Sequence, residues 1–358
     1  MNRHRNSHPA SVTPAARLAG VVLLGLPLVA FAPRGEAQES RIELRIADSL
    51  PAGHIIAENL TKPWMKLATE LSGGRLVFKY YPAEQMGKAK DMLTLTQSGV
   101  IDIGYVGPSY ISEKMPLSAV AELPGAATNA CQVMRAYWSL AKDDGPLYTN
   151  EFKPNRIRPL LVAALPPYQI VLGSSKSVSS LKDLEGTKLR ASGGAQNLTL
   201  DRLNVIPVRM SPPEIYESMS RGTIDGTLFS FVSVESYKLT PLTKTATVGS
   251  NFGTVLVTYS ISDAKWAKLP PEAKRALIEA GDRTVQSACA AFDAQERAAG
   301  EKLKSAGAQL VEFKGADGAA FGRIADEVAS AWAADLDKRG KPGTATLTAF
   351  RDALAKAK

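Results

Sequence analysis

Hydrophobic and polar positions along the chain follow two periods that replace one another in turn. Residues 41–48 and 75–82 alternate apolar and polar positions, as half-buried strands do. Between them, residues 54–74 carry apolar positions at helical spacing and end at a glycine pair. A second helix is predicted over 88–99 and a strand over 100–108. Strands that alternate with helices in this way indicate βαβ units, and therefore an α/β sheet.

The same alternation returns between residues 156 and 230. The predicted strands cover 156–165, 168–175, 187–192, 205–211 and 223–230, and the predicted helices cover 195–204 and 212–222. A short capped turn is expected at 179–186, because Ser180 and Asp183 have capping-box spacing. Two α/β lobes follow from this repetition, with the chain passing from one to the other near Leu165–Tyr168.

A third pattern begins at Pro270 and Pro271 and ends at Gly307. It is helical for about 36 residues, which at 1.5 Å per residue corresponds to roughly 54 Å. A helix longer than one lobe is wide must contact both lobes. Gly281 and Gly300 are positions at which it could bend. A strand over 308–313 and alanine-rich helices complete the chain.

The predicted fold is therefore a two-lobed α/β fold with one long helix spanning both lobes. Lobe 1 is expected to comprise residues 38–166, completed by about 254–290. Lobe 2 is expected to comprise residues 167–253, completed by about 291–358. A chain of 358 residues is long enough for two such units.

The first 37 residues differ from the rest. A basic, irregular start precedes the apolar run LAGVVLLGLPLVAFA, and the small residues Gly35 and Ala37 follow at the positions of a cleavage site. The run is too short and wrongly flanked for a membrane span, although a membrane anchor is the alternative. We expect a signal peptide over residues 1–37 that is cleaved near Ala37, and a mature protein in the periplasm.

Charge and cysteine usage narrow the function further. The net charge is +8, of which the predicted signal peptide contributes +3, leaving +5 that is spread without a lysine–arginine tract. Nucleic acid binding is therefore not expected.

Cys131 and Cys289 both lie on helix-like segments beside apolar residues. Two buried thiols are the favoured interpretation, and a disulfide formed in an oxidising compartment is the alternative.

The side chains that an enzyme needs are not found in this sequence. Beyond the predicted signal peptide there is one histidine, His54, which follows Gly53 at a helix start and is interpreted as a cap-region side chain. One histidine and two distant cysteines make no zinc site, and no nucleophile elbow or glycine-rich phosphate loop is present. We expect no enzyme activity, no cofactor and no metal. A cleft between two lobes is instead a typical ligand site, and it closes by hinge motion.

An ordered set of motifs supports this interpretation. GGRLVFKYYPAEQMGKAKDMLTLTQSGVIDIGYVGPSY lies in lobe 1, SVSSLKDLEGTKLRASG and VIPVRMSPPEIYESMSRGTIDG lie in lobe 2, and WAKLPPEAKRALIEAG opens the long helix. The set resembles the periplasmic solute-binding proteins of TRAP transporters, of the C4-dicarboxylate-binding type. The resemblance implies a receptor that binds a small organic anion and delivers it to the two membrane subunits of an ion-driven permease. We expect this receptor to be a monomer.

The resemblance also implies a ligand residue. In that family an arginine at the end of the corresponding lobe 2 strand forms a bidentate salt bridge with the ligand carboxylate, and the matching residue is Arg190. A planar guanidinium fits a carboxylate, and the small residues Ser192, Gly193 and Gly194 leave room beside it. The alternative is an arginine in an ordinary surface ion pair.

Further ligand contacts are implied at Asn197, Tyr168, Gly107 and Pro108. Ile170 matches a position where some relatives carry a second arginine, and Phe229 matches one that often holds an asparagine; Phe231 adds another ring. Replacing a cation and an amide with apolar groups shifts a pocket toward apolar ligands. We therefore expect a monocarboxylate with an apolar or aromatic body. The alternative is that Phe229 and Phe231 are core residues.

Two other functions stay open at this point. One is an ABC-type or sensory binding protein, and the other is an exported enzyme on the same fold. The long late helix and the DLEGTKLR motif favour the TRAP type, and the missing catalytic residues disfavour the enzyme.

Overall fold

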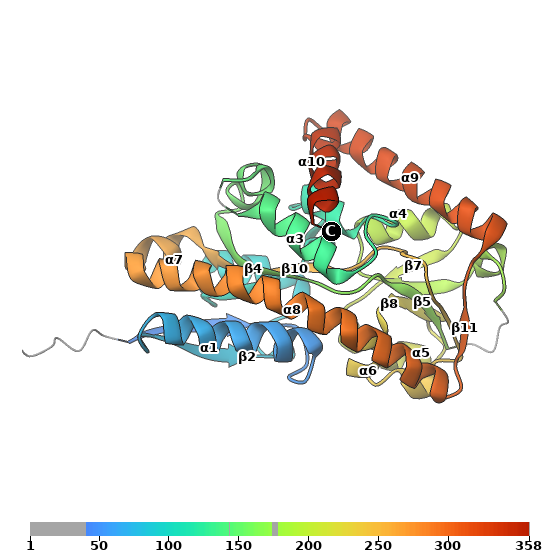
Figure 1. Ribbon diagram of the computed structural model, residues 1–358, viewed down its shortest axis with the longest axis horizontal. Helices are drawn as coiled ribbons and strands as arrows, with labels where there is room; N and C mark the ends of the chain where they lie inside the picture. Colours follow the sequence, from blue (N-terminus) through green and yellow to red (C-terminus); the bar gives the residue numbers. More distant parts are fainter. Residues whose placement is uncertain (1–40, 143, 174–177, 358) are drawn as a thin grey trace, which may run out of the picture. The chain divides into compact units, whose positions relative to one another are not determined.

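Two mixed β-sheets organise the chain in a computed structural model that describes residues 41–142, 144–173 and 178–357 (Figure 1). The first sheet has the strand order β2-β1-β3-β10-β4 and defines the first lobe. Its strands are β1 (Ile42–Ala47), β2 (Leu76–Tyr81), β3 (Ile103–Val106), β4 (Ile157–Ala164) and β10 (Leu256–Ser262). The second sheet has the order β11-β9-β5-β8-β6-β7 and defines the second lobe. Its strands are β5 (Gln169–Leu172), β6 (Lys188–Ala191), β7 (Ile206–Arg209), β8 (Gly226–Phe229), β9 (Thr245–Thr247) and β11 (Gln309–Val311).

Each predicted strand and helix has a counterpart in the structure, usually shorter by a few residues. The helices are α1 (Lys62–Leu71), α2 (Met92–Ser98), α3 (Ala130–Ala141), α4 (Ala195–Arg202), α5 (Ile215–Ser220), α6 (Phe231–Ser236), α7 (Asp263–Lys268), α8 (Pro271–Ser305), α9 (Gly315–Lys338) and α10 (Gly343–Lys356). The predicted capping box is present, with Ser180 and Asp183 at the start of the 3₁₀ turn η6 (Leu181–Leu184). The α/β prediction with two sheets is confirmed.

Two segments cross side by side between the lobes. The backbone N–H of Leu165 donates to Val255 at 3.1 Å, and that of Tyr168 donates to Gly253 at 2.7 Å. Phe252 donates back to Tyr168 at 3.1 Å. The crossing at Leu165–Tyr168 lies where the sequence pattern changed, while the full residue boundaries expected for the two lobes stay a prediction.

Helix α8 confirms the long predicted helix, with 35 residues. It packs against α1, α3 and β4 of the first lobe and against α6 of the second, and in Figure 1 it runs past both sheets. Gly281 and Gly300 lie inside this unbroken helix. A Cβ at Gly281 would lie 1.9 Å from the carbonyl oxygen of Leu160, and one at Gly300 would lie 3.0 Å from the ring of Phe231. Both glycines therefore allow close packing of the helix on the lobes.

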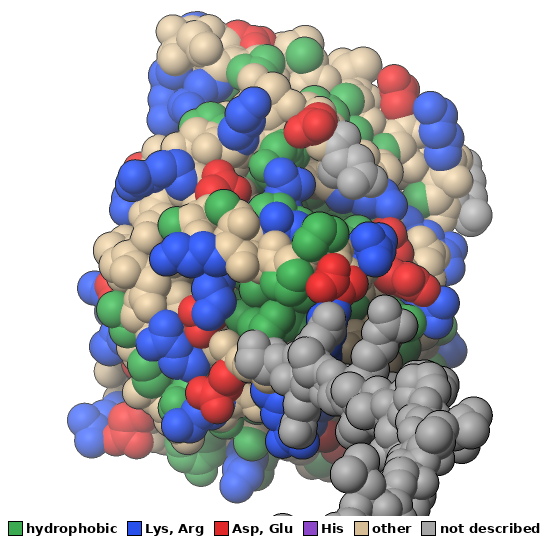
Figure 2. All heavy atoms as spheres, turned by 90° about the vertical axis from the view of Figure 1, so that its left-hand side faces the viewer, with side chains coloured by type: hydrophobic (Ala, Val, Ile, Leu, Met, Phe, Trp, Pro, Cys, Tyr) green, Lys and Arg blue, Asp and Glu red, His purple; other side chains and the backbone are tan. Residues whose placement is uncertain are grey.

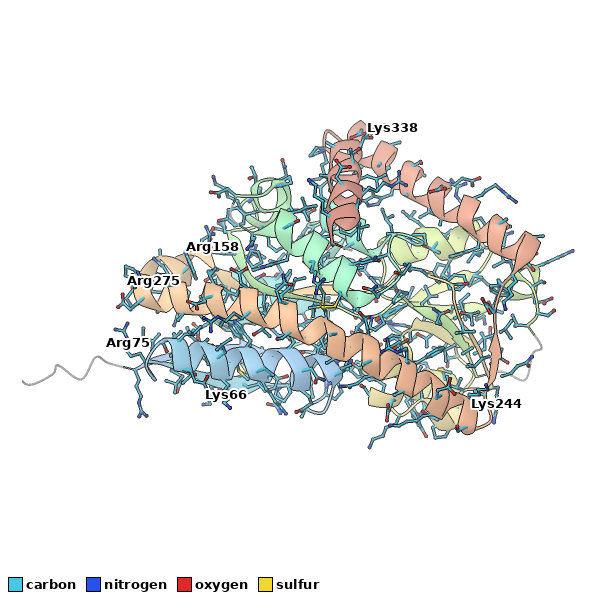
Figure 3. The ribbon with its side chains drawn as sticks, viewed as in Figure 1. Lys66, Arg75, Arg158, Lys244, Arg275 and Lys338 are labelled. Carbon is cyan, nitrogen blue, oxygen red and sulfur yellow. A yellow bond between two sulfur atoms is a disulfide. The ribbon has the colours of Figure 1, made fainter. Side chains whose placement is uncertain are left out.

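Cys131 on α3 and Cys289 on α8 form a disulfide, drawn in yellow in Figure 3. The favoured interpretation of two free thiols is therefore wrong, and the alternative holds. The two helices also meet through Asp293, whose carboxylate accepts the backbone N–H of Ala130 at 2.8 Å. The disulfide joins residues 158 positions apart, and closing so long a loop in the unfolded chain stabilises the native state by about 4–5 kcal/mol in the chain-entropy model.

The predicted signal peptide lies outside the described residues. Within the described part of the chain, no helix is both long and apolar enough to cross a membrane. On the face shown in Figure 2, lysine and arginine side chains are interspersed with aspartate and glutamate rather than gathered in one patch.

Candidate functional site

Arg190 is fully buried at the end of β6, between β7 and β8. Its Nε donates to the carbonyl oxygen of Met210 at 3.0 Å, and its Nη2 donates to the hydroxyl of Tyr110 at 3.4 Å. Nη1 has no hydrogen-bond partner among the described residues, and none of their carboxylates forms an ion pair with this guanidinium. A buried cation without a counter-ion is costly, so the site is suited to an anion. The alternative of a surface ion pair does not hold.

Aromatic rings surround this guanidinium. The ring centroid of Phe229 lies 5.5 Å from Cζ of Arg190, within cation–π range. The rings of Tyr168 and Tyr237 pack on Phe229, with centroids 5.7 and 5.5 Å away. The strand register explains the grouping: Arg190 pairs with Thr227, and Phe229 two residues later projects from the same face of the sheet.

Tyr110 is the residue of the first lobe that contacts the Arg190 guanidinium. Gly107 and Pro108 begin the 3₁₀ segment η3 (Pro108–Ile111), which carries Tyr110 to the guanidinium. A Cβ at Gly107 would lie 2.8 Å from the Tyr110 ring, so glycine leaves the space that this ring fills. Gly107 and Pro108 therefore lie next to Tyr110, and their expected contact with the ligand stays a prediction. Tyr110, the side chain that reaches Arg190, is one that sequence reasoning missed. The available signal was a tyrosine two residues after the proline.

Ile170 is not brought into this group, and Asn197 lies on α4, which packs on β6 and β7. Ile170 pairs with Leu228 on β8, one residue from Phe229, so its side chain projects from the opposite face of the sheet. Asn197 lies in the first turn of α4, where its Oδ1 has no hydrogen-bond partner among the described residues. Its neighbour Gln196 instead ties α4 to the crossing segment by donating to Thr254 at 3.0 Å. The role expected for Ile170 stays a prediction that this geometry does not favour, and the role expected for Asn197 stays a prediction.

The two phenylalanines of the same stretch have different surroundings. Phe231 begins α6 and packs beside Gly300 of α8, away from the Arg190 group. Its backbone N–H donates to Glu296 at 2.8 Å, and burial raises the pKa of that carboxyl to about 7. Phe231 is thus the core residue of the pair, and Phe229 lies beside the guanidinium.

His54 lies at the other end of the aromatic group, in the first lobe. Its side chain is 1% exposed, and its ring centroid is 5.7 Å from that of Tyr237. Its Nδ1 accepts the backbone N–H of Ile56 at 3.2 Å, as expected for a cap-region side chain. Burial lowers the pKa of His54 to about 3, so the imidazole is neutral.

Arg209 connects the two lobes at the mouth of the site. From the end of β7, its Nη2 donates to the backbone carbonyl groups of Ser109, at 3.3 Å, and Tyr110. Gly193 has a φ of +116°, and a Cβ there would lie 2.8 Å from the Ser109 oxygen and 3.0 Å from Nε of Arg209. Glycine therefore provides the passage through which the Arg209 side chain reaches the first lobe.

A groove of about 560 Å³ opens beside this connection. Its lining includes Tyr110 and Met210, which both contact Arg190. Its charged residues are Lys88, Lys90, Lys114, Arg209, Glu113 and Glu214. The excess of cations favours the approach of anions.

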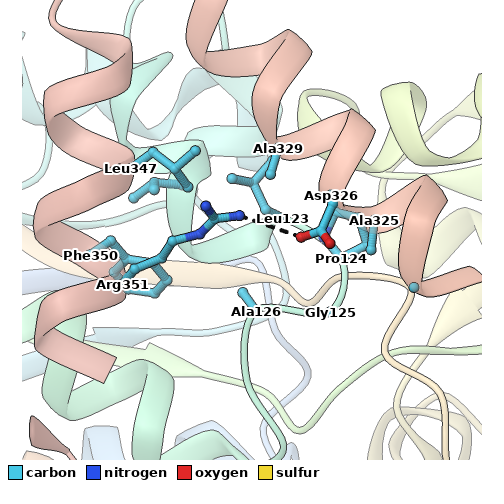
Figure 4. A pocket seen from close by; sticks show the side chains of 12 residues that line it. Leu123, Pro124, Gly125, Ala126, Ala325, Asp326, Ala329, Leu347, Phe350 and Arg351 are labelled. Atoms are coloured by element: carbon cyan, nitrogen blue, oxygen red, sulfur yellow. Dashed lines mark ion pairs between the residues drawn. The ribbon is translucent and has the colours of Figure 1, made fainter. Parts of the chain in front are cut away.

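A second cavity, of about 400 Å³, is separate from the Arg190 group (Figure 4). It lies between α9, α10 and the segment 123–126, and Arg351 faces Asp326 across it at 3.6 Å. In the described part of the chain, no three His, Cys, Asp or Glu side chains are placed to hold a metal ion.

A protein-family model described as bacterial extracellular solute-binding protein, family 7, matches residues 46–335. The chain belongs to this family. It is a solute receptor of the TRAP-transporter type, and its function is binding rather than catalysis. The expectation drawn from the motif set is thereby confirmed, and the ABC-type and enzyme alternatives are set aside.

Individual relatives of this TRAP receptor agree with the assignment. The 2,3-diketo-L-gulonate-binding periplasmic protein of Escherichia coli is 24% identical over 306 residues, which cover 84% of this chain and 87% of the relative. A solved TRAP solute-binding protein from Rhodoferax ferrireducens, in complex with copurified benzoate, superposes with a TM-score of 0.81 at 27% identity, covering 88% of this chain and 98% of that one. A marine metagenome TRAP solute-binding protein with 3-hydroxybenzoate has a TM-score of 0.82 at 23% identity, covering 89% and 99%. These structures confirm the two-lobed fold with the long helix.

Proposed function

We propose that this TRAP receptor binds an aromatic monocarboxylate beside Arg190 and delivers it to the membrane subunits of its transporter. The observation that carries the proposal is the buried guanidinium of Arg190, whose Nη1 has no partner among the described residues. A carboxylate would pair with this cation through charge-assisted hydrogen bonds. The Phe229 ring beside it offers an apolar and aromatic surface to the body of the ligand.

The surroundings favour one carboxylate over two. Arg209, another cation of the groove, already donates to two backbone carbonyl groups. The Phe229, Tyr168 and Tyr237 rings carry no charge that could compensate a second carboxylate in the closed site. The solved relatives support the same class, since one was found with benzoate and another with 3-hydroxybenzoate.

The same proposal covers the export of the protein and its membrane partners. Residues 1–37 act as a signal peptide that is removed near Ala37, and the mature receptor is a periplasmic monomer. It meets the small and large membrane subunits of a TRAP permease when it carries ligand. Co-purification of the liganded receptor with these subunits and mass spectrometry of the exported protein test this part.

The ligand class is tested by titration calorimetry with benzoate, cyclohexanecarboxylate and succinate. We expect benzoate to bind about tenfold or more tighter than succinate, a difference of about 1.4 kcal/mol. Cyclohexanecarboxylate has similar bulk without the aromatic ring, so weaker binding of this acid would show that the rings recognise an aromatic body. Tighter binding of succinate than of benzoate would contradict the proposal.

A further inference from the structure

Two buried polar atoms at the far end of the aromatic group have no partner among the described residues: Nε2 of His54 and the hydroxyl of Tyr237. They belong to opposite lobes, and their rings are in contact at 5.7 Å. The Tyr237 ring in turn packs on Phe229, which also lies beside Tyr168 and Arg190. The two unpaired atoms and the guanidinium are therefore linked by one continuous group of packed rings. Buried polar groups without partners are uncommon in native proteins and point to a missing partner.

The hydrogen bonding of His54 determines what that partner must be. Its Nδ1 accepts the N–H of Ile56, so this nitrogen carries no proton. A neutral imidazole then has its proton on Nε2, which makes Nε2 a donor in need of an acceptor. The Tyr237 hydroxyl can both donate and accept. Burial raises the pKa of Tyr237, and therefore its hydroxyl keeps its proton.

Charge distinguishes between the oxygen groups that could fit. The Asp48 carboxyl raises the pKa of Tyr237 further, whereas Arg190 lowers it. A ligand carboxylate is favoured at the Arg190 end, and a neutral oxygen is favoured at the His54 end. A hydroxyl group meets both needs, since it can accept from Nε2 of His54 and donate to Tyr237.

We infer that His54 and Tyr237 form a second polar anchor of the ligand site, which binds a hydroxyl substituent on the ring of an aromatic monocarboxylate. The inference rests on the proposed function and makes the ligand class narrower: hydroxylated aromatic acids are preferred over the unsubstituted acid. His54 and Tyr237 are then specificity-determining residues, and Arg190 supplies affinity common to all members of the class.

Titration calorimetry with benzoate and with its 3-hydroxy and 4-hydroxy derivatives tests the anchor. The wild-type protein should bind the better hydroxybenzoate about tenfold or more tighter than benzoate. In His54→Asn, the amide oxygen is separated from the backbone by the same number of bonds as Nδ1 of the histidine. It can therefore still accept the N–H of Ile56, but the Nε2 donor is lost. This variant should lose most of the preference, because its affinity for the better hydroxybenzoate falls by more than its affinity for benzoate.

Two further variants serve as matched controls. In His54→Gln, the amide nitrogen is separated from the backbone by the same number of bonds as Nε2 of the histidine. This variant should therefore restore part of the preference for the hydroxybenzoate. Tyr237→Phe keeps the ring and removes the hydroxyl, so it should lower the affinity for the better hydroxybenzoate by more than it lowers the affinity for benzoate. A purely structural role of His54 would instead change the affinity for all three acids equally.

The outcomes separate the two proposals. If the wild-type protein binds benzoate but does not discriminate in favour of a hydroxybenzoate, or if His54→Asn keeps the full preference, the second anchor is refuted and the proposed function stands. If none of the three acids binds, the proposed function fails together with the inference.

Discussion

Replacing Arg190 with methionine separates the cost of burying a cation from its use in binding. Methionine is unbranched and apolar, so it replaces the aliphatic part of the arginine side chain without the charged guanidinium. For ligand binding, the change leaves the ligand carboxylate without its partner, which costs about 2–5 kcal/mol. This range corresponds to a loss of affinity of roughly 30- to 5,000-fold.

The free energy of unfolding of the ligand-free protein should respond differently. The variant loses the hydrogen bonds to Met210 and Tyr110, worth about 0.5–1.5 kcal/mol each. It also removes a fully buried guanidinium with an unpaired Nη1, whose burial costs several kcal/mol. Because the two contributions oppose each other, we expect the stability of the empty protein to be unchanged or raised.

Calorimetric titration with benzoate and urea unfolding without ligand measure the two quantities. Arg190→Lys is the control, because it keeps the charge but lacks the planar fork; its affinity should fall between those of the wild type and the methionine variant. If Arg190→Met binds benzoate with near-normal affinity, Arg190 does not pair with the ligand carboxylate. A loss of more than about 3 kcal/mol in the ligand-free protein, beyond what two hydrogen bonds supply, would show that the guanidinium instead holds the fold together.

Three other predictions follow from the contacts described above. Gly281→Ala should lower the midpoint of thermal unfolding because its Cβ would collide with β4, whereas Gly322→Ala, within α9 and with nothing within 4 Å of its Cβ, should stabilise by about 0.5–1 kcal/mol. Burial raises the pKa of Glu122 from 4.5 to about 8, so the folded state binds more protons than the unfolded state between these values, and stability falls as the pH rises through this window. Glu122→Gln should reduce that slope in urea unfolding measured from about pH 5 to 8, and an unchanged slope would assign the effect to another carboxyl. Arg209→Ala removes two hydrogen bonds between the lobes and should accelerate ligand dissociation in stopped-flow experiments more than it slows association; an unaltered dissociation rate would contradict this role.

Local patterns predicted the elements of this fold well, because strand alternation, the Ser180–Asp183 capping box and the long run after Pro270 each involve neighbouring residues. The order of strands within the sheets depends on contacts between distant residues and was not predicted. The disulfide was not the favoured interpretation for the same reason. Cys131 and Cys289 meet only because α3 and α8 pack together. Two isolated cysteines in a sequence carry no information on that packing.

The site shows the same division. The position of Arg190 at a strand end beside small residues is visible in the sequence, and its burial without a counter-ion agrees with the role expected of it. Ile170 was placed beside Phe229 by correspondence with relatives, but a difference of one residue in strand register moves a side chain to the other face. Tyr237 follows a stretch for which the pattern predicted no helix, and His54 was interpreted only as a cap residue. Their contact exists only between the folded lobes.

The place of β10 between β3 and β4 has a consequence for the order in which the protein can be assembled. β3 and β4 end at Val106 and Ala164, but the strand that joins them runs from Leu256 to Ser262. Until it arrives, both carry unpaired backbone edges that can pair with other chains. Strands β5 to β9 of the second lobe are meanwhile contiguous in sequence, so this lobe can form most of its sheet first. Insertion of a central strand from so far along the chain is a slow, non-local step, and a chain that stops before Leu256 would keep its first sheet divided in two.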